Sequence, residues 1–137
     1  MMISTKGRYA LRVMIDLAEH PGVRCIPLKD IARRQEISEK YLEMILRSLV
    51  DGNFLTGIRG KGGGYRLSRA PESYSVGSIL RLTEGNLAPV ACLEENAPAC
   101  PRKDFCRTLP LWKGLEKTVY DYLDSYTLAD LIADTPR

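Results

Sequence analysis

Three of the four cysteines in this 137-residue chain stand close together, with the spacing C-x7-C-x5-C. They are Cys92, Cys100 and Cys106, and they lie in a stretch, residues 86–108, with three prolines and no helical or strand period. Zinc sites usually pair cysteines two to four residues apart and add a fourth cysteine or histidine, and neither condition is met here. Thiolates on an irregular loop can hold an iron–sulfur cluster, although four cysteines or a histidine substitute are usual. From the residues alone, a cluster, three free thiols and a reversible disulfide all remain open.

Little else in the chain has the pattern of a catalytic site. The only histidine, His20, falls at the end of a predicted helix, so we interpret it as a helix cap rather than a ligand. Cys25 has no second cysteine near it, and a buried thiol is the expected role. Gly62 stands where a phosphate-binding P-loop would need Ser or Thr after Lys61. Since no nucleophile and base are paired either, we predict that the protein is not an enzyme.

The residues before the cysteines have the pattern of a winged helix-turn-helix. Apolar residues at helical spacing predict a first helix over residues 6–20, with Thr5 as its cap, and a second over residues 28–35. A third helix begins after Ser38, whose hydroxyl can accept an unpaired backbone N–H, and ends at Gly52. We therefore expect a mainly α fold with a small β-hairpin wing.

The wing is expected from two short apolar and β-branched runs, residues 54–59 and 65–68, separated by Gly60-Lys61-Gly62-Gly63-Gly64. Glycines permit positive φ and close approach to another backbone. Arg59, Lys61, Arg66 and Arg69 surround this turn with positive charge, which suits a narrow groove of DNA. The residues predicted to bind DNA are Lys29 of the second helix, Ser38, Glu39, Lys40, Tyr41 and Glu43 of the third, and Arg59, Lys61, Gly62 and Gly63 of the wing.

Charge is distributed unevenly along the chain. Residues 1–70 contain 13 Lys and Arg against 7 Asp and Glu, a net charge of +6, whereas residues 71–137 contain 7 against 10, a net charge of −3. A basic half that coincides with a helix-turn-helix pattern is typical of a nucleic-acid binder. No run approaches the ~18 apolar residues of a membrane span, and the first residues lack the pattern of a signal peptide. We expect a cytoplasmic protein that does not contact membranes, in which cysteines are thiols or metal ligands rather than structural disulfides.

The residues after the wing predict a dimerisation element. A short helix over residues 76–84, capped by Ser75, is followed by the cysteine loop and by a long helix from Leu109. Along this long helix Trp112, Leu115, Val119, Tyr122 and Tyr126 recur in steps of three and four, the pattern of a coiled-coil seam, and we expect the seam to meet a second copy of the chain. Residues 127–130 resemble a capping box. The predicted organisation is a DNA-binding domain over residues 1–85, a sensor loop over 86–108, and a dimerisation helix with tail over 109–137.

Several of these stretches together resemble the Rrf2 family of winged-helix transcription regulators, which includes IscR, NsrR and CymR. Ile3-Ser4-Thr5-Lys6-Gly7-Arg8-Tyr9-Ala10 is similar to the start of the family, and Ser38-Glu39-Lys40-Tyr41-Leu42-Glu43 to its recognition helix. Ile58-Arg59-Gly60 with Gly62-Gly63-Gly64-Tyr65 is similar to its wing. Trp112 and Thr127-Leu128-Ala129-Asp130-Leu131 are similar to its dimerisation helix and tail.

The resemblance implies a homodimer on a pseudo-palindromic operator in double-stranded DNA. In the cluster-bearing branch it also implies a 2Fe-2S or 4Fe-4S cluster on the three cysteines of residues 92–106. IscR-like members complete that site with a histidine at the position of Leu109, and NsrR-like members with an acidic residue of the partner subunit at the position of Arg8. Neither residue can donate here. The remaining candidates for a fourth ligand are Glu94, Glu95, Asp104, an exogenous thiol or water.

We therefore predict a dimeric repressor whose operator affinity is controlled by a redox-sensing iron–sulfur cluster, 2Fe-2S in preference to 4Fe-4S, that purified protein can lack. The alternative is a CymR-like regulator of cysteine and sulfur metabolism that holds no cluster. Such a regulator would respond to thiol oxidation or to a partner protein, for example an enzyme of sulfur metabolism.

Overall fold

A computed structural model of the chain describes residues 3–22 and 24–133, and it confirms the expected mainly α fold with a hairpin wing. The helices are α1 Thr5–Glu19, α2 Leu28–Gln35, α3 Glu39–Asp51, α4 Val76–Glu84, α5 Leu109–Asp124 and α6 Leu128–Ile132; the strands are β1 Leu55–Ile58 and β2 Gly64–Leu67. Short 3-10 turns lie at Pro71–Ser73, Ala91–Leu93 and Lys103–Phe105. Among the described residues, no helix combines the length and apolar composition that crossing a bilayer requires.

Side-chain caps determine where several helices begin. Ser38 caps α3 and Ser75 caps α4, as predicted. Thr127 and Asp130 form the predicted capping box of α6. The prediction for α1 was wrong by one residue, since Ser4 rather than Thr5 accepts the backbone N–H of Gly7. Ser4 is held in the capping position because the Glu84 carboxylate of α4 accepts from both its N–H, at 2.8 Å, and its hydroxyl, at 2.7 Å.

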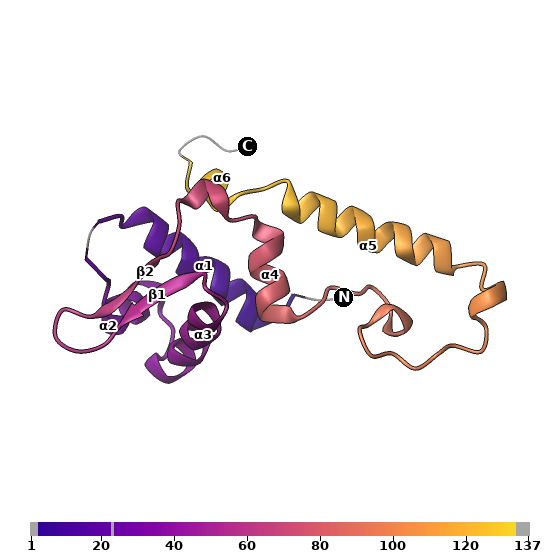
Figure 1. The fold of residues 1–137 in the computed structure, drawn as a ribbon, viewed down its shortest axis with the longest axis horizontal. Helices are drawn as coiled ribbons and strands as arrows, with labels where there is room; N and C mark the ends of the chain where they lie inside the picture. Colours follow the sequence, from indigo (N-terminus) through magenta and orange to yellow (C-terminus); the bar gives the residue numbers. More distant parts are fainter. Residues whose placement is uncertain (1–2, 23, 134–137) are drawn as a thin grey trace.

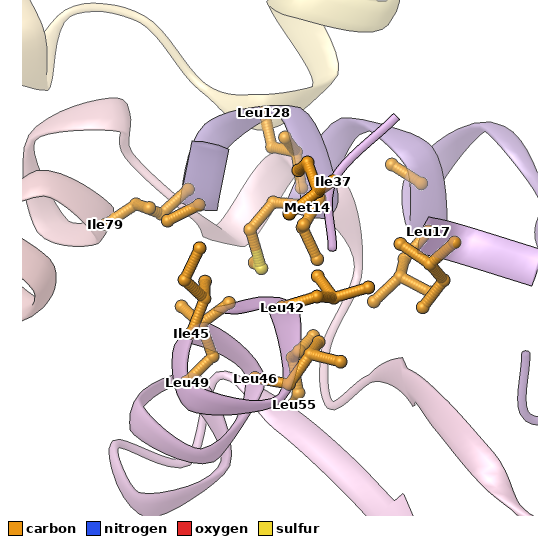
Figure 2. Packing of buried hydrophobic residues seen from close by; sticks show 14 of the residues in the cluster. Met14, Leu17, Ile37, Leu42, Ile45, Leu46, Leu49, Leu55, Ile79 and Leu128 are labelled. Atoms are coloured by element: carbon orange, nitrogen blue, oxygen red, sulfur yellow. The ribbon is translucent and has the colours of Figure 1, made fainter. Parts of the chain in front are cut away.

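One apolar cluster holds the winged-helix body together (Figure 2). Met14 of α1, Leu42 and Ile45 of α3, Ile79 of α4 and Leu128 of α6 are each completely buried in it. Full burial of such side chains stabilises the fold by roughly 1.5–3 kcal/mol each. Because Leu128 is part of this cluster, the tail after the long helix packs on the winged-helix body. The sequence analysis had assigned this tail to the dimerisation part of the chain.

The wing is a short antiparallel hairpin whose register runs from Leu55↔Leu67 to Ile58↔Gly64. A third segment lies along it, because Ile26 and Tyr65 exchange two backbone hydrogen bonds of 2.8 and 2.9 Å. Gly64 has a φ of +144°, and a Cβ on it would lie 2.3 Å from the carbonyl oxygen of Ile26. Only glycine fits there, and this close approach ties the wing to the residues that precede α2.

A second, smaller cluster joins α4 to α5. Val76, Leu80 and Leu87 are buried in it, and half-buried side chains of Val119, Tyr120, Leu123 and Tyr126 pack against them. All sixteen residues of α5 are described, and none is fully buried. Figure 1 shows residues 86–124, which we call the arm, projecting from the winged-helix body. The wing and the cysteine-bearing segment 92–106 are therefore at opposite ends of the protein.

Candidate DNA-binding surface and cysteine hollow

The third helix turns its polar face outward because its apolar face is buried. Leu42 and Ile45 have no exposed surface, whereas Glu39, Lys40 and Glu43 on the opposite side are exposed. The Ser38 hydroxyl accepts the backbone N–H of Tyr41 and so caps the first turn of α3. The N-terminal half of a recognition helix is the part that reaches base edges in a major groove.

The predicted contact residues of α3 and the wing line two adjoining hollows. The first, of about 500 Å³, is lined on the α3 surface by Ser38, Lys40, Tyr41 and Glu43. The second, of about 730 Å³, lies between α3 and the hairpin and includes Glu43, Arg59 and Gly63. Because Glu43 lines both, the helix and the wing offer one continuous surface.

Arg47 and Met44 belong to this surface, although neither was among the predicted contact residues. Arg47 lines both hollows, and its guanidinium lies 3.6 Å from the carboxylate of Glu43. Met44 is 48% exposed. Arg47 follows Glu43 by four residues, so the helical period places the two side chains on the same face. An exposed pair of this kind is weak, and a phosphate can compete with Glu43 for Arg47.

The remaining predicted contact residues lie outside both hollows. Lys61 and Gly62 are exposed at the wing tip, where Gly60 and Gly62 have φ values of +90° and +78°. Lys29 and Glu39 are exposed in the first turns of α2 and α3. None of these four residues lines either hollow.

One wing cation departs from the expected position at the tip. The guanidinium of Arg69 lies 4.5 Å from the ring centroid of Tyr74 and 5.3 Å from that of Phe54. The Tyr74 hydroxyl accepts the backbone N–H groups of Ser68 and Arg69 and donates to the carbonyl of Phe54. Arg69 thus packs by cation–π contact at the base of the hairpin, not around its tip.

A buried ion pair fixes α2 against α1 behind this surface. Asp16 is 1% exposed and accepts two hydrogen bonds from Arg34, at 2.9 and 2.7 Å, and one from Gln35, at 2.9 Å. Burial by itself raises the pKa of Asp16, but the bonds and charge of Arg34 and the Gln35 amide outweigh it, so the pKa is lowered. His20 caps α1 as predicted, and its Nδ1 lies 2.7 Å from the Asp16 carbonyl oxygen. The sequence analysis did not predict the ion pair between Asp16 and Arg34.

All three cysteines of the loop line one hollow of about 310 Å³. Their segment, residues 92–106, lies toward the outer end of the arm (Figure 1). Cys92 and Cys100 are exposed and Cys106 is half-buried. Leu109, the first residue of α5, lines the same hollow. The structure therefore places on one hollow three thiols that are spread over residues 92–106 of an irregular segment.

The donor set of this hollow is three thiols without a fourth partner. Glu94, Glu95 and Asp104 are exposed and are not part of the lining. Within residues 3–22 and 24–133, no three His, Cys, Asp or Glu side chains converge closely enough to hold one metal ion. A hydrogen bond with the Thr108 hydroxyl lowers the pKa of Cys106.

The base of the arm is clamped to α4 by polar contacts. Arg81 donates two hydrogen bonds to Asp124, at 2.8 and 2.7 Å, and its guanidinium lies 4.5 Å from the ring centroid of Tyr120. The Tyr120 hydroxyl accepts the backbone N–H of Leu87 at 2.8 Å. The first residues of the loop, α4 and α5 are thus held in one arrangement.

The predicted dimer seam is divided between two environments. Val119 and Tyr126 pack against the small cluster of their own chain, and Tyr126 lies beyond the end of α5 at Asp124. Leu115 is 39% exposed and Tyr122 60% exposed, and Leu111, which the seam did not include, is 62% exposed. Trp112 is half-buried. Part of the predicted seam thus packs within its own chain, and other apolar residues of α5, such as Leu111 and Leu115, are exposed.

Comparison with known proteins places this architecture in a family. Residues 3–134 match the Rrf2 family, described as iron-dependent transcriptional regulators. The chain belongs to the Rrf2 family. It is 41% identical over 134 residues to the protein rrf2 of Nitratidesulfovibrio vulgaris, an alignment that covers 98% of this chain and 89% of that protein. The predicted class of function, a transcriptional regulator and not an enzyme, is therefore confirmed for this Rrf2-family member.

Two solved structures resemble this Rrf2-family chain along most of its length. CymR, the global cysteine regulator of B. subtilis, has a TM-score of 0.77 and 38% identity, with 98% of each chain covered. IscR of T. potens has a TM-score of 0.75 and 36% identity, covering 96% of this chain and 86% of that one. The similarity extends through the arm as well as the winged-helix body. The two similar structures are a CymR and an IscR, the two kinds of regulator named in the sequence analysis.

Proposed function

We propose that the protein is a dimeric repressor that reads a pseudo-palindromic operator with α3 and the wing and responds to an iron–sulfur cluster held by Cys92, Cys100 and Cys106. The observation that carries this proposal is the placement of the three thiols on one hollow. The description of the family as iron-dependent and the likeness to IscR of T. potens support it.

The proposed DNA contacts divide into base-reading and phosphate-binding residues. Lys40 and Glu43 stand on the exposed face of α3, where Lys40 can donate to guanine or phosphate and Glu43 can accept from the amino group of cytosine. Arg59 and Lys61 flank glycines that offer no rigid surface for base recognition, so they bind phosphate. The net charge of +6 in residues 1–70 supplies the long-range attraction.

The proposed dimer forms through the exposed apolar residues of α5. Leu111 and Leu115 are exposed apolar residues, Tyr122 is exposed on the same helix, and Trp112 and Val119 lie beside them. A two-fold contact between two such helices would give a pair of α3 helices for two half-sites about one helical turn apart.

The three thiols fit an iron–sulfur cluster in chemical type, and all three line one hollow. When bound, the cluster would supply a centre sensitive to iron supply and oxidation. The chain connects this site to the body, because the loop leaves α4 through Leu87 and enters α5 three residues after Cys106. The clamp between Arg81 and Asp124 joins these two helices, so a change in the loop on cluster binding would be transmitted to α4, which packs on α1 and α3.

The test begins with anaerobic purification, an absorption spectrum, and iron and sulfide analysis. Cys92→Ala, Cys100→Ala and Cys106→Ala should each abolish iron binding and give one common operator affinity. Cys25→Ala is the matched control, because Cys25 lies between α1 and α2, far from the arm, and should bind iron as the parent does. Iron retained by all three variants would contradict the cluster.

The likeness to CymR favours a second candidate function, a regulator of sulfur metabolism that holds no cluster. Cys92 and Cys100 are exposed, so an oxidant can reach both thiols. In that case an oxidant alone would change operator affinity in iron-free protein, and the three alanine variants would differ from one another. The same set of proteins therefore separates the two functions.

A further inference from the structure

We propose that the outer face of the wing and the segment before α2 form a second phosphate-binding surface, which holds the DNA backbone on the side of the wing away from α3. The guanidinium groups of Arg24 and Arg66 bind the phosphates of that backbone. This inference rests on the proposed DNA binding and adds a backbone strand that the contacts of α3 do not include.

The strand register explains why Arg66 is on the outer face of the wing. Thr56 and Arg66 are cross-strand partners, so their side chains share one face of the hairpin. Leu55 and Leu67, the next pair in the register, pack on the core, so the face that carries Arg66 is the outer one. The hydroxyl of Ser68 lies 3.1 Å from that of Thr56, so this outer face is polar as well as positively charged.

A hollow of about 450 Å³ lies between this outer face and the end of α1. Arg24, Arg66 and Arg69 line it. Among the described residues of its lining none is Asp or Glu, whereas both hollows beside α3 include Glu43. A lining with cations and no carboxylate suits phosphates, which only accept hydrogen bonds, rather than base edges, which present donors as well as acceptors.

Arg24 reaches this hollow from a second element. Ile26 exchanges two backbone hydrogen bonds with Tyr65 of β2, which holds the segment before α2 along the hairpin. Arg24 stands two residues before this bridge and is exposed, as Arg66 is. Within the part of the chain that the structure describes, neither guanidinium has a carboxylate within 4.0 Å. Two exposed cations without an internal partner favour an anion from outside the chain.

Continuity with the proposed DNA surface favours a DNA backbone over a free phosphate. Tyr65 lines both this hollow and the hollow between α3 and the hairpin, so the hairpin separates the two. A wing that enters a groove has a phosphate backbone on each side, because two backbones border every groove of a duplex. Since α3 lies on one side of the hairpin, Arg24 and Arg66 on the other side meet the second backbone.

The experiment uses the operator that the full chain selects from random duplexes. Arg24→Gln and Arg66→Gln should each lower the salt slope of log K by about one and together by about two, with base preference unchanged. Arg24→Lys with Arg66→Lys keeps both charges and should keep the parent slope. Arg69 stays in place, because its guanidinium packs on two aromatic rings. Lys117→Gln is the matched control, since it removes one charge from a 77% exposed side chain of α5 and should leave the slope unchanged.

Ethylation of single phosphates maps the contacts directly. In the parent, the phosphates whose ethylation blocks binding should lie on both backbones of the groove that the wing enters, and in the double glutamine variant on one. An unchanged slope and an unchanged map in that variant would overturn this inference while the proposed function stands. Inorganic phosphate that binds the parent but not this variant, with the same map for both, would assign the hollow to a free anion and overturn the inference as well. A parent that selects no operator would overturn the proposed function and this inference with it.

Discussion

Substitution of Arg34 by alanine would leave the buried carboxylate of Asp16 without its main partner. Arg34 supplies two of the three side-chain hydrogen bonds that Asp16 accepts, and it supplies the opposite charge. The pair connects α1 to α2, the helix that precedes α3. The substitution should therefore lower the free energy of unfolding and loosen the helix-turn-helix.

The magnitude follows from the burial of the two partners. Removing one member of a fully buried ion pair costs about 3–5 kcal/mol, because the other charge remains buried and uncompensated. The Asp16 side chain is 1% exposed, but that of Arg34 is 30% exposed. Water can enter the space vacated by Arg34, and Gln35 still donates to Asp16, so we expect a loss of about 2–3 kcal/mol. That is a large share of the roughly 5–15 kcal/mol that stabilises a domain.

The pH dependence gives a second, independent signature. In the parent the lowered pKa of Asp16 means that the stabilising contribution is complete above an ordinary aspartate pKa of about 4 and is lost as the pH falls through the native pKa. In Arg34→Ala the raising effect of burial is less opposed, so Asp16 takes up its proton at higher pH. Protonation removes the uncompensated charge, and the difference in stability between parent and variant should narrow as the pH falls from 7 toward 3.

Urea unfolding followed by circular dichroism at several pH values measures both effects. Arg33→Ala is the matched control, since Arg33 is the preceding residue of α2, its side chain is 75% exposed, and its guanidinium lies 3.6 Å from the Asp30 carboxylate. It should cost less than about 0.5 kcal/mol at any pH. A loss in Arg34→Ala no greater than that of the control, or a difference independent of pH, would refute the role assigned to the pair.

Three further predictions concern the proposed function. Leu111→Asp with Leu115→Asp places charges in the proposed dimer contact, so the double variant should sediment as a monomer, and a dimer would show that this face is not the interface. Lys61→Ala should weaken binding to all DNA sequences similarly and reduce the salt slope of log K by about one, whereas Glu43→Ala should change base preference; an unchanged salt slope would remove the wing tip from the contacts. Leu109→His adds a nitrogen donor to the cysteine hollow and should slow iron loss to a chelator several-fold; unchanged loss would place residue 109 away from the fourth position.

Local sequence determined the helices and most of their ends. The second helix has the predicted bounds, Leu28–Gln35, and the caps at Ser38, Ser75 and Thr127 are where the sequence indicated them. These features depend on interactions between residues three or four apart, which helical periodicity and capping chemistry describe directly. The glycine-rich turn was recognisable for the same reason, because its positive φ angles are a property of single residues.

Tertiary packing alone decided how distant residues are paired. Asp16 meets Arg34, Ser4 meets Glu84 and Arg81 meets Asp124, in each case across a contact between two helices. The sequence contains each polar side chain but carries no local signal for its partner, because the way the helices cross decides which residues meet. The same holds for the seam of α5, whose apolar period is visible in the sequence although its division between α4 and the surface is not.

The cysteine loop combines both kinds of determination. Residue types and spacing alone narrowed its chemistry to thiols, a disulfide or a cluster, because sulfur donors on an irregular segment support few others. Whether the three cysteines face one hollow, and that Lys103, Lys113 and Leu109 face it with them, depends on how residues 86–108 return to the start of α5. An irregular segment has no repeating geometry from which side-chain directions follow, so only the folded structure could bring these residues together.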